Sequence, residues 1–247
     1  MASVKLLQAV SPLIDLVYPP RCPLCGEGLA MQQGLCGTCW GELAIPGEPA
    51  CATCQRPFGD SGVLDGAICA PCLANPPRHD GVTAGTLYND AARKLVLSYK
   101  HGGRIALAPM LARLMAARLP VLEGDWIAVP VPLHRMRLWK RGFNQSALLA
   151  REVARLRGTG LCVDGLTRRK ATVPLGGLGK TARARALSGA IAITRARSDT
   201  IQGAQILLVD DVVTSGATSD ACVRALKQGG ASAVRIVCFA RVLDEAL

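Results

Sequence analysis

The sequence contains few aromatic residues and no long apolar run. Its 247 residues include three each of Trp, Tyr and Phe, too few for a nucleic-acid platform of many stacked aromatic rings. Arg113 and Arg118 interrupt the longest apolar candidate, so no stretch approaches the roughly 20 residues that a membrane-spanning helix needs. Near the amino terminus, Asp15 lies within the apolar stretch and no clear cleavage site follows, which argues against a secretory signal. We therefore expect a cytoplasmic protein without a membrane span.

Acidic residues are nearly absent from one segment of the chain. Residues 135–197 hold 15 basic and 2 acidic residues, a net charge of +13, which exceeds the +11 of the whole chain. Residues 1–80 hold 4 basic and 7 acidic residues, a net charge of −3. A solvated face usually mixes both signs, whereas concentrated positive charge favours an anionic partner. The segment therefore predicts binding of phosphate, pyrophosphate or nucleic acid.

Cysteine is concentrated near the amino terminus, where eight of the eleven cysteines form four C-x-x-C pairs. Each pair supplies two thiolates from a tight turn, and two pairs complete a tetrahedral zinc site with no open position. The predicted ligands are Cys22, Cys25, Cys36, Cys39, Cys51, Cys54, Cys69 and Cys72. Sequential pairing is the simplest arrangement, and a crossed one remains open. A thioredoxin-like redox role needs one such pair beside a βαβ unit, which is absent here, so we predict two structural Zn²⁺ ions.

The character of the chain changes after Pro76-Pro77, which predicts a leading helix and zinc module over residues 1–77 and a second domain over 78–247. In the second domain, apolar strand patterns alternate with helical patterns. We expect strands over 81–88, 126–132, 161–167, 206–209 and 233–240, and helices over 91–100, 105–118, 145–157 and 216–228. A basic loop is expected after 132, and no regular structure over 168–180. This alternation predicts an α/β fold with a parallel sheet flanked by helices on both faces.

The strongest candidate for a ligand-binding site begins at Ile206, in the segment I-L-L-V-D-D-V-V-T-S-G-A-T-S. A buried strand delivers Asp210 and Asp211 to the sheet edge where α/β proteins bind ligands. Small residues at 214–218 then lead into a helix, whose amino terminus suits a phosphate. The loop contains no Lys, so it is not a nucleoside-triphosphatase P-loop. A helix cap beside a solvated acidic pair, or a Mg²⁺ site of the response-regulator kind, explains half of the segment each, whereas a sugar phosphate fits both halves.

This segment resembles the 5-phosphoribosyl-1-pyrophosphate (PRPP) motif of type I phosphoribosyltransferases. The resemblance implies that Asp210 and Asp211 are the catalytic residues that hold the ribose 2′- and 3′-hydroxyls, and that Mg²⁺ accompanies PRPP. It assigns the 5′-phosphate to Thr214, Ser215, Gly216, Ala217 and Thr218. Pyrophosphate is the leaving group of PRPP reactions, and the basic side chains that follow the preceding strand suit it. These are Arg135, Arg137, Lys140 and Arg141.

The segment V-P-V-P-L-H-R-M-R-L-W-K-R-G-F-N-Q at 129–145, together with Y-K-H-G-G-R at 99–104 and the cysteine pairs, resembles the ComF family of ComFC- and GntX-like proteins. The resemblance implies a type I phosphoribosyltransferase-like domain preceded by a double zinc ribbon, and a role in DNA uptake during natural competence. In the region that resembles the flexible hood of phosphoribosyltransferases, Thr172, Leu178 and Arg183 match the family pattern. Leu175 and Ala186 replace a Gln and an Asn there, which puts turnover in doubt more than PRPP binding.

Three functional hypotheses follow, and they do not exclude one another. The protein is a phosphoribosyltransferase with an unidentified acceptor, or a single-stranded DNA-binding competence factor for which PRPP is only a regulatory or vestigial ligand. In the third, the zinc module docks a competence helicase or channel protein. His79, His101 and His134 are isolated in the sequence, so none is an obvious general base. We expect Cys162, Cys222 and Cys238 to be small core residues rather than metal ligands.

Overall fold

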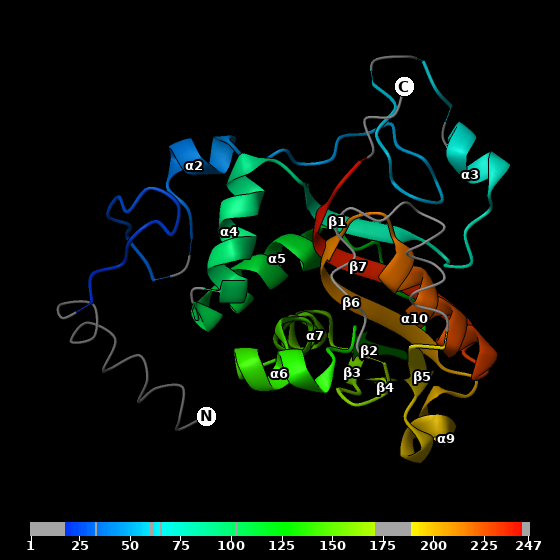
Figure 1. The fold of residues 1–247 in the computed structure, drawn as a ribbon. Helices are drawn as coiled ribbons and strands as arrows, with labels where there is room; N and C mark the ends of the chain where they lie inside the picture. Colours follow the sequence, from blue (N-terminus) through cyan, green and yellow to red (C-terminus); the bar gives the residue numbers. More distant parts are fainter. Residues whose placement is uncertain are drawn as a thin grey trace.

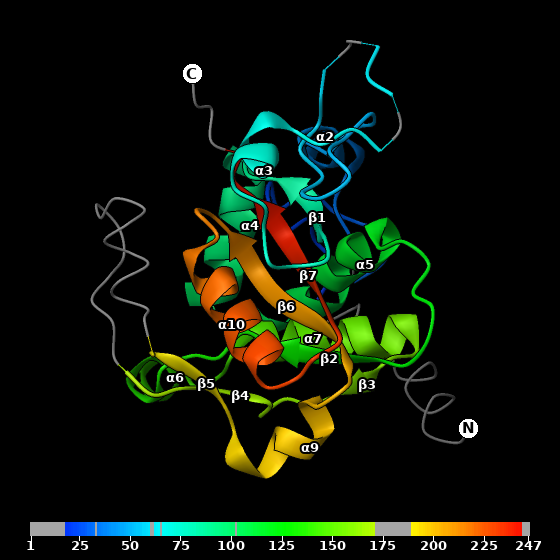
Figure 2. The ribbon, with the colours of Figure 1, turned by 90° about the vertical axis from the view of Figure 1, so that its right-hand side faces the viewer.

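A five-stranded parallel sheet forms the centre of the protein (Figures 1 and 2). The structure is a computed structural model and describes residues 18–32, 34–59, 62–64, 66–101, 103–170 and 189–243. The strand order is β1-β7-β6-β2-β3, and all neighbouring strands are parallel. The strands are β1 (Val82–Leu87), β2 (Trp126–Pro130), β3 (Gly160–Leu161), β6 (Gln205–Val213) and β7 (Ala233–Arg241). The predicted parallel sheet is therefore confirmed.

Helices cover both faces of the sheet, as the apolar strands predict. Alternate residues of β6 belong to different core clusters, because successive strand side chains point to opposite faces. The helices around the sheet are α4 (Asp90–His101), α5 (Ala108–Arg118), α7 (Gln145–Arg157), α9 (Ser198–Ile201) and α10 (Ala217–Gln228), with short 3-10 turns η1 (Ile105–Leu107) and η2 (Arg195–Arg197). Leu207 and Val209 pack in the cluster that contains α4, α5 and α7, whereas Ile206 and Leu208 pack in the cluster that contains α10.

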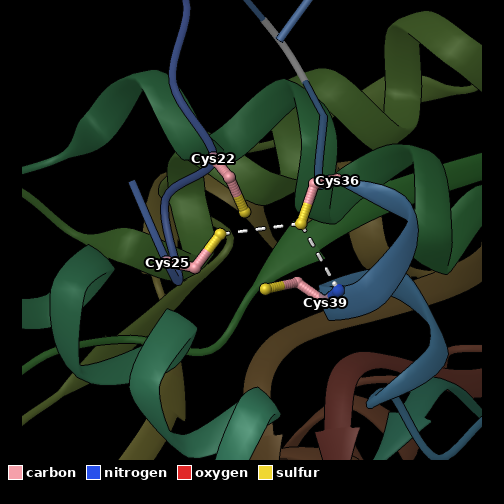
Figure 3. Close-up of side chains that lie close together, drawn as sticks. All are labelled: Cys22, Cys25, Cys36 and Cys39. Carbon is pink, nitrogen blue, oxygen red and sulfur yellow. Dashed lines mark hydrogen bonds between the residues drawn. The ribbon is translucent and has the colours of Figure 1, made fainter. Parts of the chain in front are cut away.

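Two similar cysteine-rich units precede the sheet. Each contains an isolated antiparallel bridge and a short helix. The bridges join Arg21 to Gly28 and Ala50 to Pro57, and the helices are α2 (Gly37–Gly41) and α3 (Ala70–Ala74). In the first unit the four cysteine side chains point toward one another, and two of the four come from the turn that leads into α2 and from α2 itself (Figure 3). The repeated cysteine pattern of the sequence is therefore a repeated structural unit.

The first cysteine-rich unit is joined directly to the end of β1. Leu87 N donates to Ala44 O at 2.7 Å, and Asn89 Nδ2 donates to Glu42 O at 2.7 Å. Leu43 is buried in the same core cluster as α5 and α7. The unit thus shares hydrogen bonds and apolar contacts with the sheet, which holds it in a defined position.

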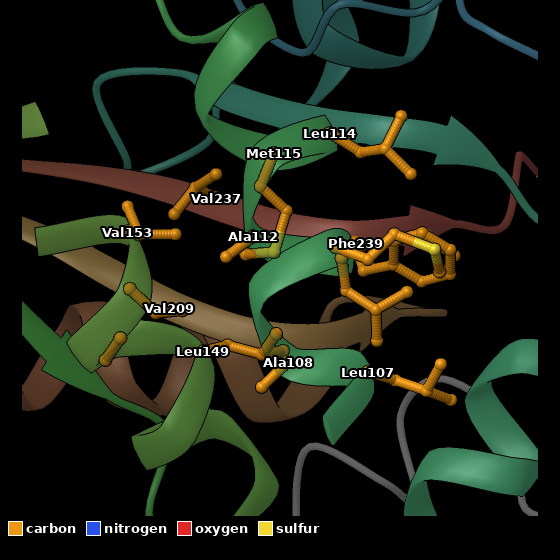
Figure 4. Packing of buried hydrophobic residues seen from close by; sticks show 14 of the residues in the cluster. Leu107, Ala108, Ala112, Leu114, Met115, Leu149, Val153, Val209, Val237 and Phe239 are labelled. Carbon is orange, nitrogen blue, oxygen red and sulfur yellow. The ribbon is translucent and has the colours of Figure 1, made fainter. Parts of the chain in front are cut away.

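The core between α5 and the sheet is closely packed (Figure 4). Met115 of α5, Leu149 of α7 and Phe239 of β7 are fully buried. A Cβ at Gly85 in β1 would lie 3.2 Å from backbone atoms of Leu114 and Met115, so this glycine lets helix and strand approach closely. Among the described residues, none of the helices combines the length and the apolar character that crossing a bilayer requires.

Four details differ from the sequence-based expectations or lie outside the described residues. The basic loop expected after 132 contains a helix, α6 (Arg135–Arg141), capped by His134, whose Nδ1 accepts from Met136 N at 3.3 Å. The extended segment expected over 161–167 is interrupted by a turn, after which β4 (Leu166–Arg168) pairs antiparallel with β5 (Ile191–Ile193). Strand β6 continues through the acidic pair instead of ending at Val209. The leading helix and residues 171–180 lie outside the described residues.

Candidate functional site

The end of β6 and the turn before α10 border one cavity of about 530 Å³, which we call the β6 cavity. Asp210 and Asp211 line it from the strand, and residues 214–218 line it from the turn and the first positions of α10. Gly216 stands at the amino-terminal cap of α10 with a φ of +74°, a left-handed conformation that glycine adopts without strain. The structure thus brings the predicted acidic pair and the predicted phosphate turn together at one cavity.

Asp210 is held by hydrogen bonds from the chain itself. Its Oδ1 accepts from Ser146 Oγ at 3.1 Å and from Asp211 N at 2.9 Å. Burial, and then the neighbouring charge of Asp211, raise the pKa of Asp210 to about 7. The carboxyl therefore titrates near neutral pH, and a ligand hydroxyl or cation would favour its charged form.

Asp211 pairs with Lys100 of α4, whose Nζ lies 2.9 Å from Asp211 Oδ1. The other oxygen, Oδ2, is buried and has no hydrogen-bond partner among the described residues. A buried carboxylate oxygen without a donor is costly, and a ribose hydroxyl is a donor that removes this cost. Lys100 lies in the Y-K-H-G-G-R segment, where no sequence pattern indicated a role for it, because only the fold brings α4 beside β6.

The four predicted pyrophosphate ligands are not equivalent in the structure. Arg137 lines the β6 cavity. Arg141 does not line the cavity, but its Nη1 donates at 2.8 Å to Oε1 of Gln145, which does. Burial lowers the pKa of Arg141, and the charge of Asp211 opposes this shift. Arg135 and Lys140 are exposed and do not line the cavity. The helical form of α6 explains the position of Arg135, because a residue two positions before Arg137 points to the opposite side of the helix.

Two further residues of the cavity wall were missed by the sequence analysis. Ser146, near the start of α7, holds Asp210, and Arg168 of β4 is 8% exposed. Burial and then the charge of Arg137 lower the pKa of Arg168, whereas the charge of Asp210 acts in the opposite direction. No motif in the sequence indicated either residue, because both depend on contacts between distant segments. The hood positions Thr172, Leu175, Leu178, Arg183 and Ala186 lie outside the described residues.

The eight amino-terminal cysteines form two clusters, and within each the four sulfur atoms lie within 4.8 Å of one another. The clusters are Cys22, Cys25, Cys36 and Cys39 (Figure 3), and Cys51, Cys54, Cys69 and Cys72. The sulfurs of Cys25 and Cys36, and those of Cys54 and Cys69, are 3.6 Å apart. Tetrahedral zinc with bonds of about 2.3 Å separates its sulfurs by about 3.8 Å. The pairing is therefore sequential, and the donor sets fit Zn²⁺.

Within one cluster, the pKa values of some thiols are lowered and those of others are raised. Burial alone would raise the pKa of Cys51, but backbone N–H groups, first that of Cys69, lower it to about 6. Burial and the neighbouring sulfurs raise the pKa of Cys72 in the same cluster. Four sulfurs at this spacing cannot all ionise without a cation between them. The prediction that Cys162, Cys222 and Cys238 are core residues is confirmed, since all three are buried.

Known proteins resemble this chain in both of its parts. Residues 13–73 match the family model of the double zinc ribbon domain, and residues 144–246 match that of the phosphoribosyl transferase domain. The DNA utilization protein YhgH of Salmonella typhi is 32% identical over 235 residues, 92% of this chain and 100% of that protein. Competence protein F of Haemophilus influenzae is 27% identical over 228 residues, 90% of this chain and 96% of that protein.

Solved structures overlap the chain less extensively. A hypoxanthine phosphoribosyltransferase from Staphylococcus aureus covers 56% of this chain and 73% of its own, with 13% identity and a TM-score of 0.37. The family assignment therefore rests on the sequence relatives and on the two domain models in their order along the chain. The chain belongs to the ComF family, with a double zinc ribbon that provides two Cys₄ zinc sites followed by a phosphoribosyltransferase domain.

Proposed function

We propose that this protein binds PRPP with Mg²⁺ in the β6 cavity and that it acts in DNA uptake and utilization. One observation carries the first part: Asp211 Oδ2, a buried acceptor without a donor among the described residues, lies in a wall shared with the small-residue turn at 214–218. The acceptor suits a ribose hydroxyl, and the turn with the start of α10 suits the 5′-phosphate. The relatives named for DNA utilization and competence support the second part.

The roles follow from where each side chain lies. We assign the ribose hydroxyls to Asp210 and Asp211, and the pyrophosphate to Arg137 on the cavity wall and to Arg141, which is hydrogen-bonded to the lining residue Gln145. Arg135 and Lys140 lie off this wall and are not assigned to pyrophosphate. Lys100 holds Asp211 in the absence of the ligand. A ribose hydroxyl that donates to Oδ2 leaves the Lys100 ion pair in place, so this pair pre-organises the carboxylate.

If the protein turns over, the reaction is a phosphoribosyl transfer. The bond from ribose C1 to pyrophosphate breaks with its electron pair leaving on the pyrophosphate, and an acceptor nucleophile forms the new bond to C1. When bound, Mg²⁺ neutralises the leaving pyrophosphate. The two aspartates stabilise the positive charge that develops on the ribose ring. The described residues that line the cavity include no histidine, so we assign no general base and leave the acceptor unnamed.

Thermal unfolding with PRPP and Mg²⁺ tests the binding. At a PRPP concentration of about 100 times Kd the ligand stabilises by about 2.7 kcal/mol, which raises Tm by roughly 5 to 10 °C for a chain of this size. The double variant Asp210→Asn with Asp211→Asn is expected to lose the shift. Asp125→Asn, which removes an exposed carboxylate before β2, is the matched control and keeps it. A wild-type protein without a shift, or a double variant with a full one, would refute the proposal.

A specific observation favours a second candidate function, the binding of single-stranded DNA. Trp139 of α6 is 85% exposed and Met136 is 66% exposed, in the same helix as the exposed Arg135 and Lys140. An exposed aromatic ring beside positive charge is the combination that single strands bind, by base stacking and phosphate contacts. PRPP is then a regulatory ligand of the neighbouring cavity.

The DNA candidate has its own test. The triple variant Arg135→Ala, Trp139→Ala and Lys140→Ala is expected to weaken binding of a thymidine oligonucleotide and to flatten its salt dependence, while the PRPP-induced Tm shift stays unchanged. Unchanged oligonucleotide binding would exclude α6 as the contact.

We also propose that the chain divides after residue 77, that the protein is cytoplasmic, and that the zinc module provides the docking surface for a competence helicase or channel protein.

A further inference from the structure

A second cavity, of about 400 Å³, lies between the second cysteine cluster and the phosphate turn. Cys54, Cys69 and Cys72 line one side, and Thr214 and Ser215 line another. The turn residues border the β6 cavity as well. This second cavity, which we call the arginine cavity, therefore borders the same turn to which the 5′-phosphate is assigned, and the proposed function makes no use of it.

Four guanidinium groups from separate parts of the chain line the arginine cavity. Arg56 comes from the second cysteine-rich unit, Arg78 from the segment after α3, Arg224 from α10 and Arg241 from the end of β7. Asp220 is the one carboxylate among the described lining residues. Four positive groups around one space repel one another, and this repulsion favours an anion between them.

The second zinc site offsets part of the positive charge of these four arginines. A Zn²⁺ ion with four thiolates carries a formal charge of −2, and Asp220 adds −1. These negative charges offset part of the charge of the four arginines. The remaining positive charge favours a small anion such as a single phosphate group.

The cavity wall also holds a buried hydrogen-bond donor without a partner among the described residues. Nη1 of Arg241 is buried and has no hydrogen-bond partner among the described residues. His79, which lines the same wall, accepts from Gly81 N through Nδ1 at 3.2 Å. Burial, and then the charge of Arg241, lower the pKa of His79 to about 4. At neutral pH the ring is therefore uncharged, and since Nδ1 accepts, its proton is on Nε2.

We propose that the arginine cavity is a binding site for a single phosphate group, held by Arg224 and Arg241 on the phosphoribosyltransferase side and by Arg56 and Arg78 on the zinc-module side. Arginine forms paired, charge-assisted hydrogen bonds to phosphate oxygens. A phosphate there joins the zinc module to the turn between β6 and α10. The same group occurs in a free phosphate or mononucleotide and in the backbone of a single strand, and the experiment separates these sources.

The test measures inorganic phosphate bound to the zinc-loaded, full-length chain by equilibrium dialysis. We expect the wild type to hold one phosphate ion per chain more than the variant Arg224→Gln with Arg241→Gln, whose affinity at this site falls roughly tenfold or more. Arg93→Gln with Arg155→Gln removes the same charge from exposed positions on α4 and α7 and keeps the wild-type number. A cavity variant that keeps the wild-type number, or a control that loses as much, would overturn the proposal.

Two measurements show whether the cavity variant loses phosphate only because it is misfolded. Zinc content and the urea unfolding curve show whether the cavity variant folds, and Arg224→Gln alone, at an exposed position of α10, is expected to give an intermediate loss. The variant Asp210→Asn with Asp211→Asn should keep the extra phosphate ion even where it loses PRPP, so this site and the PRPP site fail separately. Displacement of the ion by a thymidine oligonucleotide identifies a strand phosphate as the source, and displacement by adenosine monophosphate alone identifies a mononucleotide.

Discussion

Replacing Asp210 with asparagine is expected to stabilise the fold above neutral pH while it removes PRPP binding. Burial, and then repulsion from Asp211, raise the pKa of Asp210 from 3.8 to about 7. Because the folded value lies above the unfolded one, the folded state binds this proton more tightly, and the contribution of Asp210 to stability falls as pH rises from about 4 to about 7. Asparagine carries no charge, so it avoids this loss.

The size of the effect follows from the shift. About three pKa units at about 1.4 kcal/mol each correspond to about 4 kcal/mol at pH 8, an upper limit because a charged site relaxes and admits water. At pH 4.5 the same pKa values leave a difference of about 1 kcal/mol. Asparagine keeps an oxygen that accepts from Ser146 Oγ and from Asp211 N, as Asp210 Oδ1 does, so the substitution changes charge more than shape.

Urea unfolding at pH 4.5 and pH 8 measures the prediction. Asp210→Asn should be about 2 to 4 kcal/mol more stable than the wild type at pH 8, with most of this advantage gone at pH 4.5. Asp125→Asn removes an exposed carboxylate and should show no such pH dependence. An advantage of equal size at both pH values, or a variant less stable than the wild type at pH 8, would refute the reasoning.

Three further predictions concern the Lys100–Asp211 ion pair, the zinc clusters and the turn before α10. Lys100→Met removes the partner of a buried carboxylate and should cost about 3 kcal/mol in urea unfolding, much of which the second substitution Asp211→Asn should restore; an additive double variant would contradict the ion pair. Cys51→Ser should reduce zinc measured by atomic absorption from about two equivalents to about one, and loss of both ions would show that the clusters are not independent. Gly216→Ala, at a φ of +74°, should cost about 1 to 2 kcal/mol and weaken PRPP binding in a thermal-shift titration, whereas a PRPP affinity equal to that of the wild type would remove the turn from the site.

Sequence patterns correctly predicted the elements whose bounds depend on neighbouring residues in the chain. The helix expected over 145–157 has the same bounds in the structure, because its apolar positions recur at helical spacing and Gly158 ends it in a left-handed conformation. Strand β6 was predicted to stop at Val209 and runs on to Val213. Its extension contains two acidic residues, which strand propensity disfavours. They are accommodated by Ser146 and Lys100, whose positions only the fold determines.

The sequence also does not show which basic residues of 135–197 are exposed and which are buried. The two carboxylates within 135–197 are both paired locally, Glu152 with Arg155 and Asp164 with Arg197, each at 2.9 Å. Arg168 of the cavity wall is buried and Arg141 is partly buried, whereas Arg135, Arg137 and Lys140 are exposed. Salt screens exposed charges strongly and buried ones weakly. Because the proposed oligonucleotide contacts use only exposed charges, raising the salt concentration should weaken oligonucleotide binding more than PRPP binding. Equal slopes would mean that both ligands use the same side chains.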